Sequence, residues 1–207
     1  MTKTDFKKQL KHLYNPSKKE FSIVDVPAMQ FLMVDGHGTP GVIQAYQDAL
    51  ETLYAVAYKI KFASKKELEQ DYTIPPLEGL WWADDVSVFT TNLDKSQWDW
   101  TMMIMQPDWI TTALFDEACA IVKKQKDPAA LSKLRLETYE EGLSVQIMHI
   151  GSYDDEGPVL YKLHHEFMPT NNYTFNGKHH EIYLSDPRRV APGKLKTVLR
   201  QPVVSKQ

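Results

Sequence analysis

The C-terminal stretch from Lys178 to Pro202 decides the fold, and it reads K-H-H-E-I-Y-L-S-D-P-R-R-V-A-P-G-K-L-K-T-V-L-R-Q-P. Its H-H-E-I-Y segment alternates as a strand does, which predicts His179, Glu181 and Tyr183 on one face and the residues between them on the other. A carboxylate between two ring-bearing side chains suits a flat, apolar or cationic ligand. From the residues alone, an edge strand with one polar face explains the same pattern.

The run from His179 to Pro202 resembles the C-terminal signature of GyrI-like small-molecule-binding proteins, in their stand-alone subgroup, and weaker similarity extends over most of the chain. The resemblance implies an α+β fold. In it, tandem β-α-β-β repeats (SHS2-like) form one concave antiparallel sheet with a central ligand cleft and a helical insert between the repeats. It also implies that Glu181 lies among aromatic side chains that stack on flat, hydrophobic, often cationic compounds.

Two stretches of the chain have similar patterns of residues. M-Q-F-L-M-V-D-G-H-G-T-P-G and V-Q-I-M-H-I-G-S-Y-D-D-E-G-P both indicate a strand, a glycine turn and a helix. G-L-W-W-A takes the place in the first half that H-E-I-Y-L takes in the second. We therefore predict a single domain over residues 1–207, with repeat one at about 21–106, a helical insert at about 107–142 and repeat two at about 143–204.

Hydrophobic periodicity and turn residues place the individual elements. Helices are predicted before residue 15, over 40–66 with proline in the first turn, over 107–126 and 128–141 in the insert, and over 158–168. Strands are predicted over 29–35, 143–150, 173–184 and 195–203, with a turn at 91–95. The helix at 128–141 is predicted because Asp127 is a credible N-cap and Pro128 suits a first helical position.

The composition of the chain argues against several classes of function. A net charge of −3 gives no electrostatic case for nucleic acid, and the first 20 residues are too short for a helix-turn-helix arm, which argues against a transcription regulator. No apolar run approaches a membrane span or a signal peptide, so we expect a cytoplasmic protein. The single cysteine, Cys119, excludes an internal disulfide, and we expect a buried structural thiol. We expect a monomer or a weak homodimer.

The number of aromatic residues is the unusual feature of the composition, with five tryptophans and ten tyrosines. Such clusters often line ligand pockets because a buried indole or phenol needs a polar partner. In a strand only one of two adjacent tryptophans can face a cleft, and the sequence does not say which. Alternating tryptophans indicate either an aromatic wall or core burial. The candidates for ligand contact are Trp81, Trp82, Trp98, Trp100, Tyr72 and Tyr153, the last two as pocket-rim residues, together with His179.

The histidine pairs His164-His165 and His179-His180 do not have the H-x-x-x-H spacing of a helical zinc site, and no aspartate or cysteine set accompanies them. Gly36 and Gly38 stand without the lysine and spacing of a phosphate-binding loop. No serine nucleophile elbow is present. We therefore predict no metal site and no cofactor.

The resemblance extends to an activity. Some stand-alone GyrI-like proteins hydrolyse the strained cyclopropane of DNA-alkylating natural products of the yatakemycin and duocarmycin type, which would make this protein a detoxifying hydrolase. Glu181 would then activate water as a general base, Tyr183 would polarise the oxygen that becomes phenolate, and Glu156 would assist as a second acid. The alternative is a non-catalytic multidrug-binding or ligand-sensing module, whose pocket needs only stacking aromatics and one carboxylate for a cation.

Overall fold

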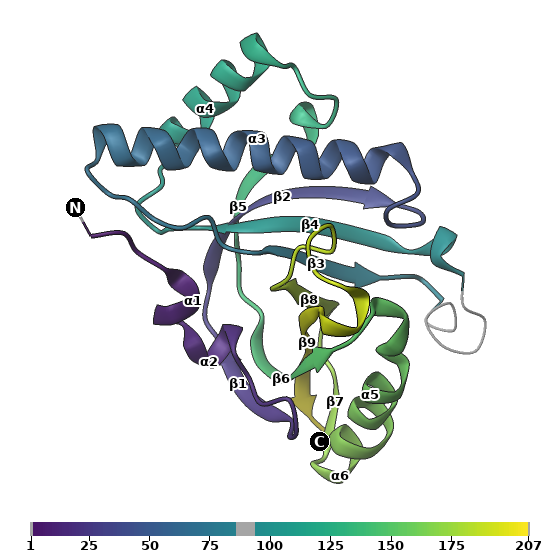
Figure 1. Cartoon of the computed structure of the whole chain (residues 1–207). Coiled ribbons are helices and arrows are strands. Elements are labelled where there is room, and N and C mark those ends of the chain that lie inside the picture. Colours follow the sequence, from purple (N-terminus) through teal and green to yellow (C-terminus); the bar gives the residue numbers. More distant parts are fainter. Residues whose placement is uncertain (1, 86–93, 207) are drawn as a thin grey trace. The chain divides into compact units, whose positions relative to one another are not determined.

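The computed structural model describes residues 2–85 and 94–206, which Figure 1 draws as a coloured ribbon. The chain divides into two compact units. Unit 1 consists of Met1–Phe6, Met29–Pro75 and Gly79–Tyr139. Unit 2 consists of Lys7–Ala28, Pro76–Glu78 and Glu140–Gln207. The repeat boundaries expected from the sequence stay a prediction. Most of the turn expected at residues 91–95 lies outside the described residues.

Unit 1 is an antiparallel sheet covered by helices, with strand order β3-β4-β2-β5. Helix α3 packs against β2 and β4, and α4 packs on α3 (Figure 1). The buried stripe of α3, which includes Leu53, Val56 and Ile60, meets the sheet and forms the core. The bounds are β2 (Met29–His37), α3 (Gln44–Glu67), β3 (Leu77–Trp82, whose first two residues belong to unit 2), a 3-10 turn (Lys95–Gln97), β4 (Asp99–Gln106), α4 (Thr112–Gln125), a 3-10 turn (Leu131–Lys133) and β5 (Arg135–Tyr139).

Trp100 fills the core of unit 1. Strand pairing places it opposite Gly36, and a Cβ atom added to that glycine would meet the indole ring at 2.1 Å. The indole is fully buried, its Nε1 donates to the carbonyl of Gly38 at 3.2 Å, and Tyr46 packs against it edge to face at 5.4 Å. Of the two interpretations that the sequence left open, core burial is the one that holds for Trp100.

The prediction of a helix over residues 128–141 is wrong. Asp127 has φ of +43°, which is not the extended conformation of an N-cap, and only a 3-10 turn precedes strand β5. Strand β5 pairs with β2 and places Leu136 opposite Leu32. This pairing outweighs local helical preference, because β-strand formation depends on partners distant in the sequence. The helix predicted at 107–126 is present as α4.

Unit 2 is a second antiparallel sheet region, with strand order β1-β6-β9-β8 and β7 paired with β9. Val145 of β6 and Val203 of β9 pack with Leu163 and Met168 of the helical segment that follows β6. The bounds are α1 (Phe6–Gln9, whose first residue belongs to unit 1), α2 (Lys11–Tyr14), β1 (Ser22–Val26), β6 (Gly142–Ile150), a 3-10 turn (Tyr153–Asp155), α5 (Gly157–Tyr161), a π-helical turn (Lys162–Phe167), α6 (Met168–Thr170), β7 (Tyr173–Phe175), β8 (His179–Tyr183), a 3-10 turn (Pro192–Lys194) and β9 (Lys196–Ser205).

The strands expected at 143–150 and 195–203 are confirmed as β6 and β9, and the region 173–184 forms β7 and β8 around the expected turn. The long helix expected at 40–66 is present as α3, although Pro40 precedes the helix and does not lie in its first turn. The α+β fold class is confirmed. No helix in residues 2–85 or 94–206 is long and apolar enough to cross a membrane.

Candidate functional site

Strand β8 presents its side chains as the sequence predicts. His180 and Ile182 are buried, whereas His179, Glu181 and Tyr183 are only partly buried. Strand β9 pairs with it, placing Leu199 beside Glu181, and this register fixes the two faces because a slip of one residue would exchange them. The confirmed alternation puts the candidate carboxylate on the more accessible face of β8.

The carboxylate of Glu181 lies between two side chains of its own strand. The hydroxyl of Tyr183 donates to Oε2 at 2.8 Å, and His179 Nε2 is 3.5 Å from Oε1. The side chains of His179 and Glu181 are 16% and 14% exposed, so the group is shielded but still reached by solvent. The ring of Tyr153 packs edge to face on Tyr183 at 5.7 Å. We call Tyr153, His179, Glu181 and Tyr183 the Glu181 cluster.

Acidic groups surround the phenol of Tyr153. Burial, followed by the negative charges of Glu181, Glu156 and Asp186, raises the pKa of Tyr153 to about 12. Tyr153 therefore keeps its proton at neutral pH and can donate a hydrogen bond. Glu156, which precedes α5, is buried. Hydrogen bonds from Arg188 lower the pKa of Asp186 to about 2, so that this carboxylate stays charged. The carboxylates of Glu181 and Glu156 beside the ring of Tyr153 are an arrangement that can receive a cationic group.

His164, on the π-helical turn, is a neighbour that the sequence did not single out for this site. Burial, and then the proximity of His179 and His165, lowers the pKa of His164 to about 4, so its imidazole is neutral at physiological pH. Its ring packs against Phe175 at 4.9 Å. Within residues 2–85 and 94–206, no three histidine, cysteine or acidic side chains are arranged to hold a metal ion.

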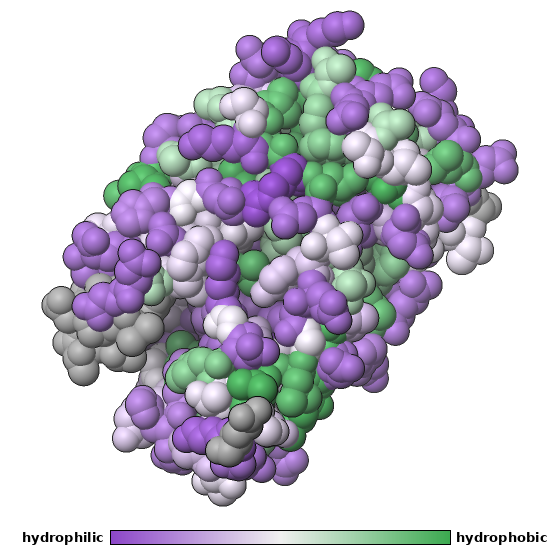
Figure 2. Space-filling view, turned by 180° about the vertical axis from the view of Figure 1, so that it is seen from behind, coloured by the Kyte–Doolittle hydropathy of each residue, from purple (hydrophilic) through white to green (hydrophobic). Residues whose placement is uncertain are grey.

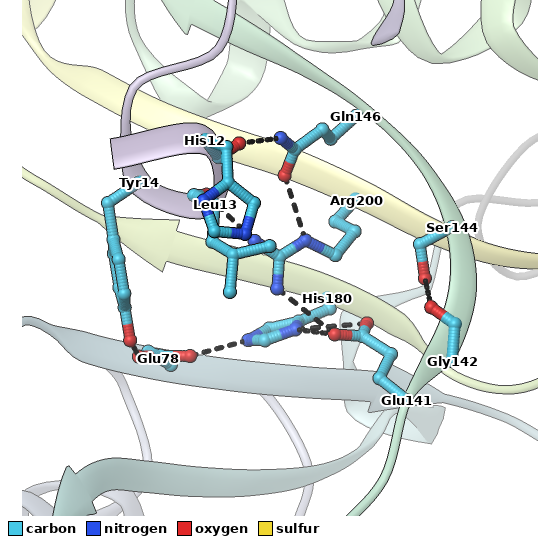
Figure 3. Close-up of polar contacts among 10 residues, drawn as sticks. All are labelled: His12, Leu13, Tyr14, Glu78, Glu141, Gly142, Ser144, Gln146, His180 and Arg200. Carbon is cyan, nitrogen blue, oxygen red and sulfur yellow. Dashed lines mark hydrogen bonds and ion pairs between the residues drawn. The ribbon is translucent and has the colours of Figure 1, made fainter. Parts of the chain in front are cut away.

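The other face of β8 is fixed by a buried polar network in unit 2 (Figure 3). His180 uses both ring nitrogens, with Nδ1 3.0 Å from each carboxylate oxygen of Glu141 and Nε2 3.0 Å from Glu78 Oε2. The hydroxyl of Tyr14 donates to the second oxygen of Glu78 at 2.9 Å. Arg200, on β9, donates from Nη1 to Glu141 at 3.1 Å. We call these five residues the His180 network.

Arg200 extends the network to the N-terminal segment. Its Nη2 donates to the carbonyl of Leu13 at 2.8 Å, and its Nε donates to Gln146 Oε1 at 3.0 Å. The amide of Gln146 in turn donates to the carbonyl of His12 at 2.6 Å. Helix α2 and the two strands that flank β9 are thus joined by buried and partly buried hydrogen bonds, which hold the segment carrying Glu181 in one register.

The charges of the network balance. Burial alone would lower the pKa of His180, but the charge of Glu141 and the hydrogen bonds from Glu141 and Glu78 outweigh it and raise the pKa to about 9. Burial would raise the pKa of Glu141, yet His180 and Arg200 lower it to about 2. Two cations therefore face two carboxylates, a balance that buried charges require because an unpaired charge is costly in the protein interior.

The tryptophan and tyrosine candidates of unit 1 have different surroundings. Trp81 is 5% exposed and packs edge to face on Trp98 at 5.8 Å, while Trp82 is partly buried. Tyr72 is fully buried and donates to Gln106 Oε1 at 3.1 Å, so the prediction that it forms a pocket rim is wrong. The phenol of Tyr72 is buried in the core, as is the indole of Trp100. Ligand contact by the other three stays a prediction, as does the cleft lined from both repeats.

Comparison with known proteins gives the family. The model of the GyrI-like small molecule binding domain matches residues 19–204. The chain therefore belongs to the GyrI-like small-molecule-binding family.

Among solved structures, an uncharacterised conserved protein from Listeria innocua is 40% identical, covers 98% of this chain and 100% of its own, and superimposes with a TM-score of 0.89. A protein from the same organism that is described as a hydrolase is 39% identical, with the same coverage and a TM-score of 0.86. The C-terminal domain of EcmrR, at 9% identity over 90% of this chain and 98% of its own and with a TM-score of 0.55, shares the fold alone. No curated protein matches the chain.

Proposed function

We propose that this protein binds flat hydrophobic or cationic small molecules at the Glu181 cluster and hydrolyses cyclopropane-bearing, DNA-alkylating natural products of the yatakemycin and duocarmycin type. The observation that carries the proposal is the carboxylate of Glu181, held by Tyr183 at 2.8 Å and flanked by His179 in a partly shielded position. Membership of a small-molecule-binding family supports the ligand class. Two Listeria relatives described as hydrolases support turnover.

The chemistry that this site can serve is the addition of one water. The substrate carries a cyclopropane conjugated to a dienone. The water oxygen bonds to the unsubstituted ring carbon as the strained carbon–carbon bond breaks, and the released electron pair moves into the dienone and makes its oxygen a phenolate. Glu181 accepts the proton that the water loses, and the phenolate then takes up a proton to give the neutral phenol. The product is the substrate plus one water, so no oxidant or cofactor is needed.

The phenols of the cluster have the complementary role. Tyr183 donates to Glu181 in the free protein, and it polarises the substrate oxygen when that oxygen replaces the carboxylate as its acceptor. Tyr153, which keeps its proton because its pKa is about 12, is the second donor within the cluster. Glu156, a further carboxylate that acts on Tyr153, assists as a second acid. The result of such turnover is detoxification of the alkylating compound.

A second candidate function is binding without turnover, in a multidrug-binding or ligand-sensing module. The observation that favours it is the concentration of negative charge from Glu181, Glu156 and Asp186 around Tyr153. Carboxylates beside aromatic rings bind a lipophilic cation without any activated water. The two functions differ in whether the ligand leaves the protein unchanged.

Turnover and binding can be separated with one pair of variants. Glu181→Gln keeps the size of the side chain but removes the base, so we expect hydrolysis of a duocarmycin-type compound to fall by about 10²- to 10⁴-fold while the affinity for the neutral compound changes little. Glu166→Gln, an exposed position on the π-helical turn, is the matched control and should leave both unchanged. Equal hydrolysis by wild type and Glu181→Gln would refute the assignment of Glu181. Tight binding with no change of mass in wild type would leave the binding module as the function.

A further inference from the structure

Helix α3 of unit 1 carries an exposed aromatic row on the side opposite its buried stripe. Tyr54, Tyr58 and Phe62 are 36%, 49% and 59% exposed, and they follow one another at intervals of four residues. Neighbouring rings lie 6.5 Å and 6.4 Å apart, the second pair stacked. We call these three residues the α3 aromatic row. Hydrophobic side chains also gather among hydrophilic ones on the face of the molecule seen in Figure 2, and such patches mark interaction surfaces.

The row is flanked by opposite charges at equal distances. Glu51 precedes Tyr54 by three residues, and Lys65 follows Phe62 by three. The order Glu51, Tyr54, Tyr58, Phe62, Lys65 is therefore symmetric in spacing about Tyr58, and all five side chains are exposed. At 3.6 residues per turn, these five positions fall within one narrow stripe of the helix surface.

A two-fold axis through Tyr58 makes this stripe complementary to itself. Two antiparallel copies of α3 would then stack Tyr58 on Tyr58 of the second copy, place Tyr54 against Phe62, and pair Glu51 with Lys65 twice. A uniformly acidic or basic partner would meet one like charge at an end of the stripe, whereas a second copy meets none. Tyrosine and phenylalanine are also enriched at the centres of protein interfaces.

A groove beside the row gives the contact a second wall. Its volume is about 410 Å³, and it is lined by α3 residues of the row and by Val122, Gln125 and Lys126 at the end of α4. Its lining combines aromatic and aliphatic side chains with the polar side chains of Glu51, Gln125 and Lys126, and protein interfaces likewise combine an apolar centre with polar groups. A second copy of α3 would cover both the row and this groove.

We propose that the α3 aromatic row is the contact of a homodimer, formed by two antiparallel copies of α3 about a two-fold axis at Tyr58. The proposal is argued from α3 and α4 of unit 1 alone and stands independently of the proposed function. The small area of a single helix pair makes the dimer a reversible one, whose population depends on protein concentration.

Reversal of the flanking charges tests the antiparallel geometry. Glu51→Lys alone places two lysines opposite each other in both pairs, and Lys65→Glu alone places two glutamates there. Each variant should therefore raise the dimer dissociation constant by roughly tenfold in sedimentation equilibrium. An equimolar mixture of the two variants restores both opposite-charge pairs, so a heterodimer should form at about the wild-type affinity. Glu67→Lys, at the exposed end of α3 outside the stripe, is the control and should dimerise as wild type does.

Two further measurements keep the test decisive. Lys65 also contacts Asp71 at 3.3 Å, and because Lys61 holds the same carboxylate at 2.8 Å, circular dichroism melting should show that Lys65→Glu remains folded. Tyr58→Arg should abolish association in the same assay without unfolding the chain. A wild-type protein that stays monomeric at the highest attainable concentration would overturn the proposal. So would a dimer that Tyr58→Arg and the charge reversals leave unchanged.

Discussion

Stability should fall at alkaline pH because of His180. The folded state raises the pKa of this histidine from 6.5 to about 9. A basic group with a raised folded-state pKa stabilises the protein fully below its unfolded pKa, and that contribution is lost as pH rises through the folded pKa. The difference of about 2.5 pKa units, at about 1.4 kcal/mol per unit, corresponds to roughly 3–4 kcal/mol. The loss should extend from about pH 6.5 to about pH 9.

The assay is urea denaturation followed by far-ultraviolet circular dichroism at closely spaced pH values from 6 to 10. Other groups also titrate in this range, so the contribution of His180 is the difference between wild type and His180→Gln. His37→Gln, at a histidine whose side chain is 60% exposed and lies 2.8 Å from Asp99, is the control for removing a histidine from the surface. If His180→Gln does not fold, the imidazole of His180 can be titrated in wild type by nuclear magnetic resonance. A midpoint near 6.5, or the same pH dependence in His180→Gln, would refute the argument.

Two substitutions, one in each unit, test the packing by denaturant unfolding. Tyr14→Phe removes the hydroxyl that donates to the buried carboxylate oxygen Glu78 Oε1 at 2.9 Å, so we expect a loss of about 1–3 kcal/mol in the free energy of unfolding. An unchanged stability would contradict the His180 network. Gly36→Ala brings a Cβ to 2.1 Å from the ring of Trp100 and should lower the free energy of unfolding by about 1–3 kcal/mol through overpacking. In the control Gly157→Ala the added Cβ meets no neighbouring group within 4 Å, so the loss should be much smaller. Equal losses in the two variants would argue against a core filled by Trp100.

The candidate site could be predicted from the sequence because its key residues lie close together in the chain. Alternation along H-H-E-I-Y is a property of five consecutive residues, and the structure confirms that Glu181 shares a face with His179 and Tyr183. The hydrogen bond between Tyr183 and Glu181 follows from that spacing. The approach of Tyr153 needed the loop after β6 to fold back onto β8, yet its place at a loop end was a usable signal.

The His180 network was not predictable in the same way. The sequence placed His180 on the opposite face of β8, but its partners Glu78 and Glu141 stand 102 and 39 residues away, and Arg200 reaches Leu13 across 187 residues. No local pattern distinguishes a buried, paired glutamate from a surface one. These partners become visible only when the strands are in register.

Long-range pairing also explains the errors in unit 1. Strand β5 exists because Leu136 lies opposite Leu32, whereas Asp127-Pro128 alone indicated the start of a helix. Trp100 was open to two interpretations, and the glycine opposite it decides between them. A glycine within a strand is itself a signal of close approach by another group, and Gly36 in β2 is such a position.

The most direct test of the central claim is the mass of a cyclopropane-bearing duocarmycin-type compound after incubation with the purified protein in ¹⁸O-labelled water. We expect wild type to give a product that has gained one labelled water, and Glu181→Gln to return the compound unchanged. A compound that wild type binds but returns at its original mass would contradict hydrolysis of this substrate class. A labelled product formed equally by Glu181→Gln would contradict the role given to the carboxylate.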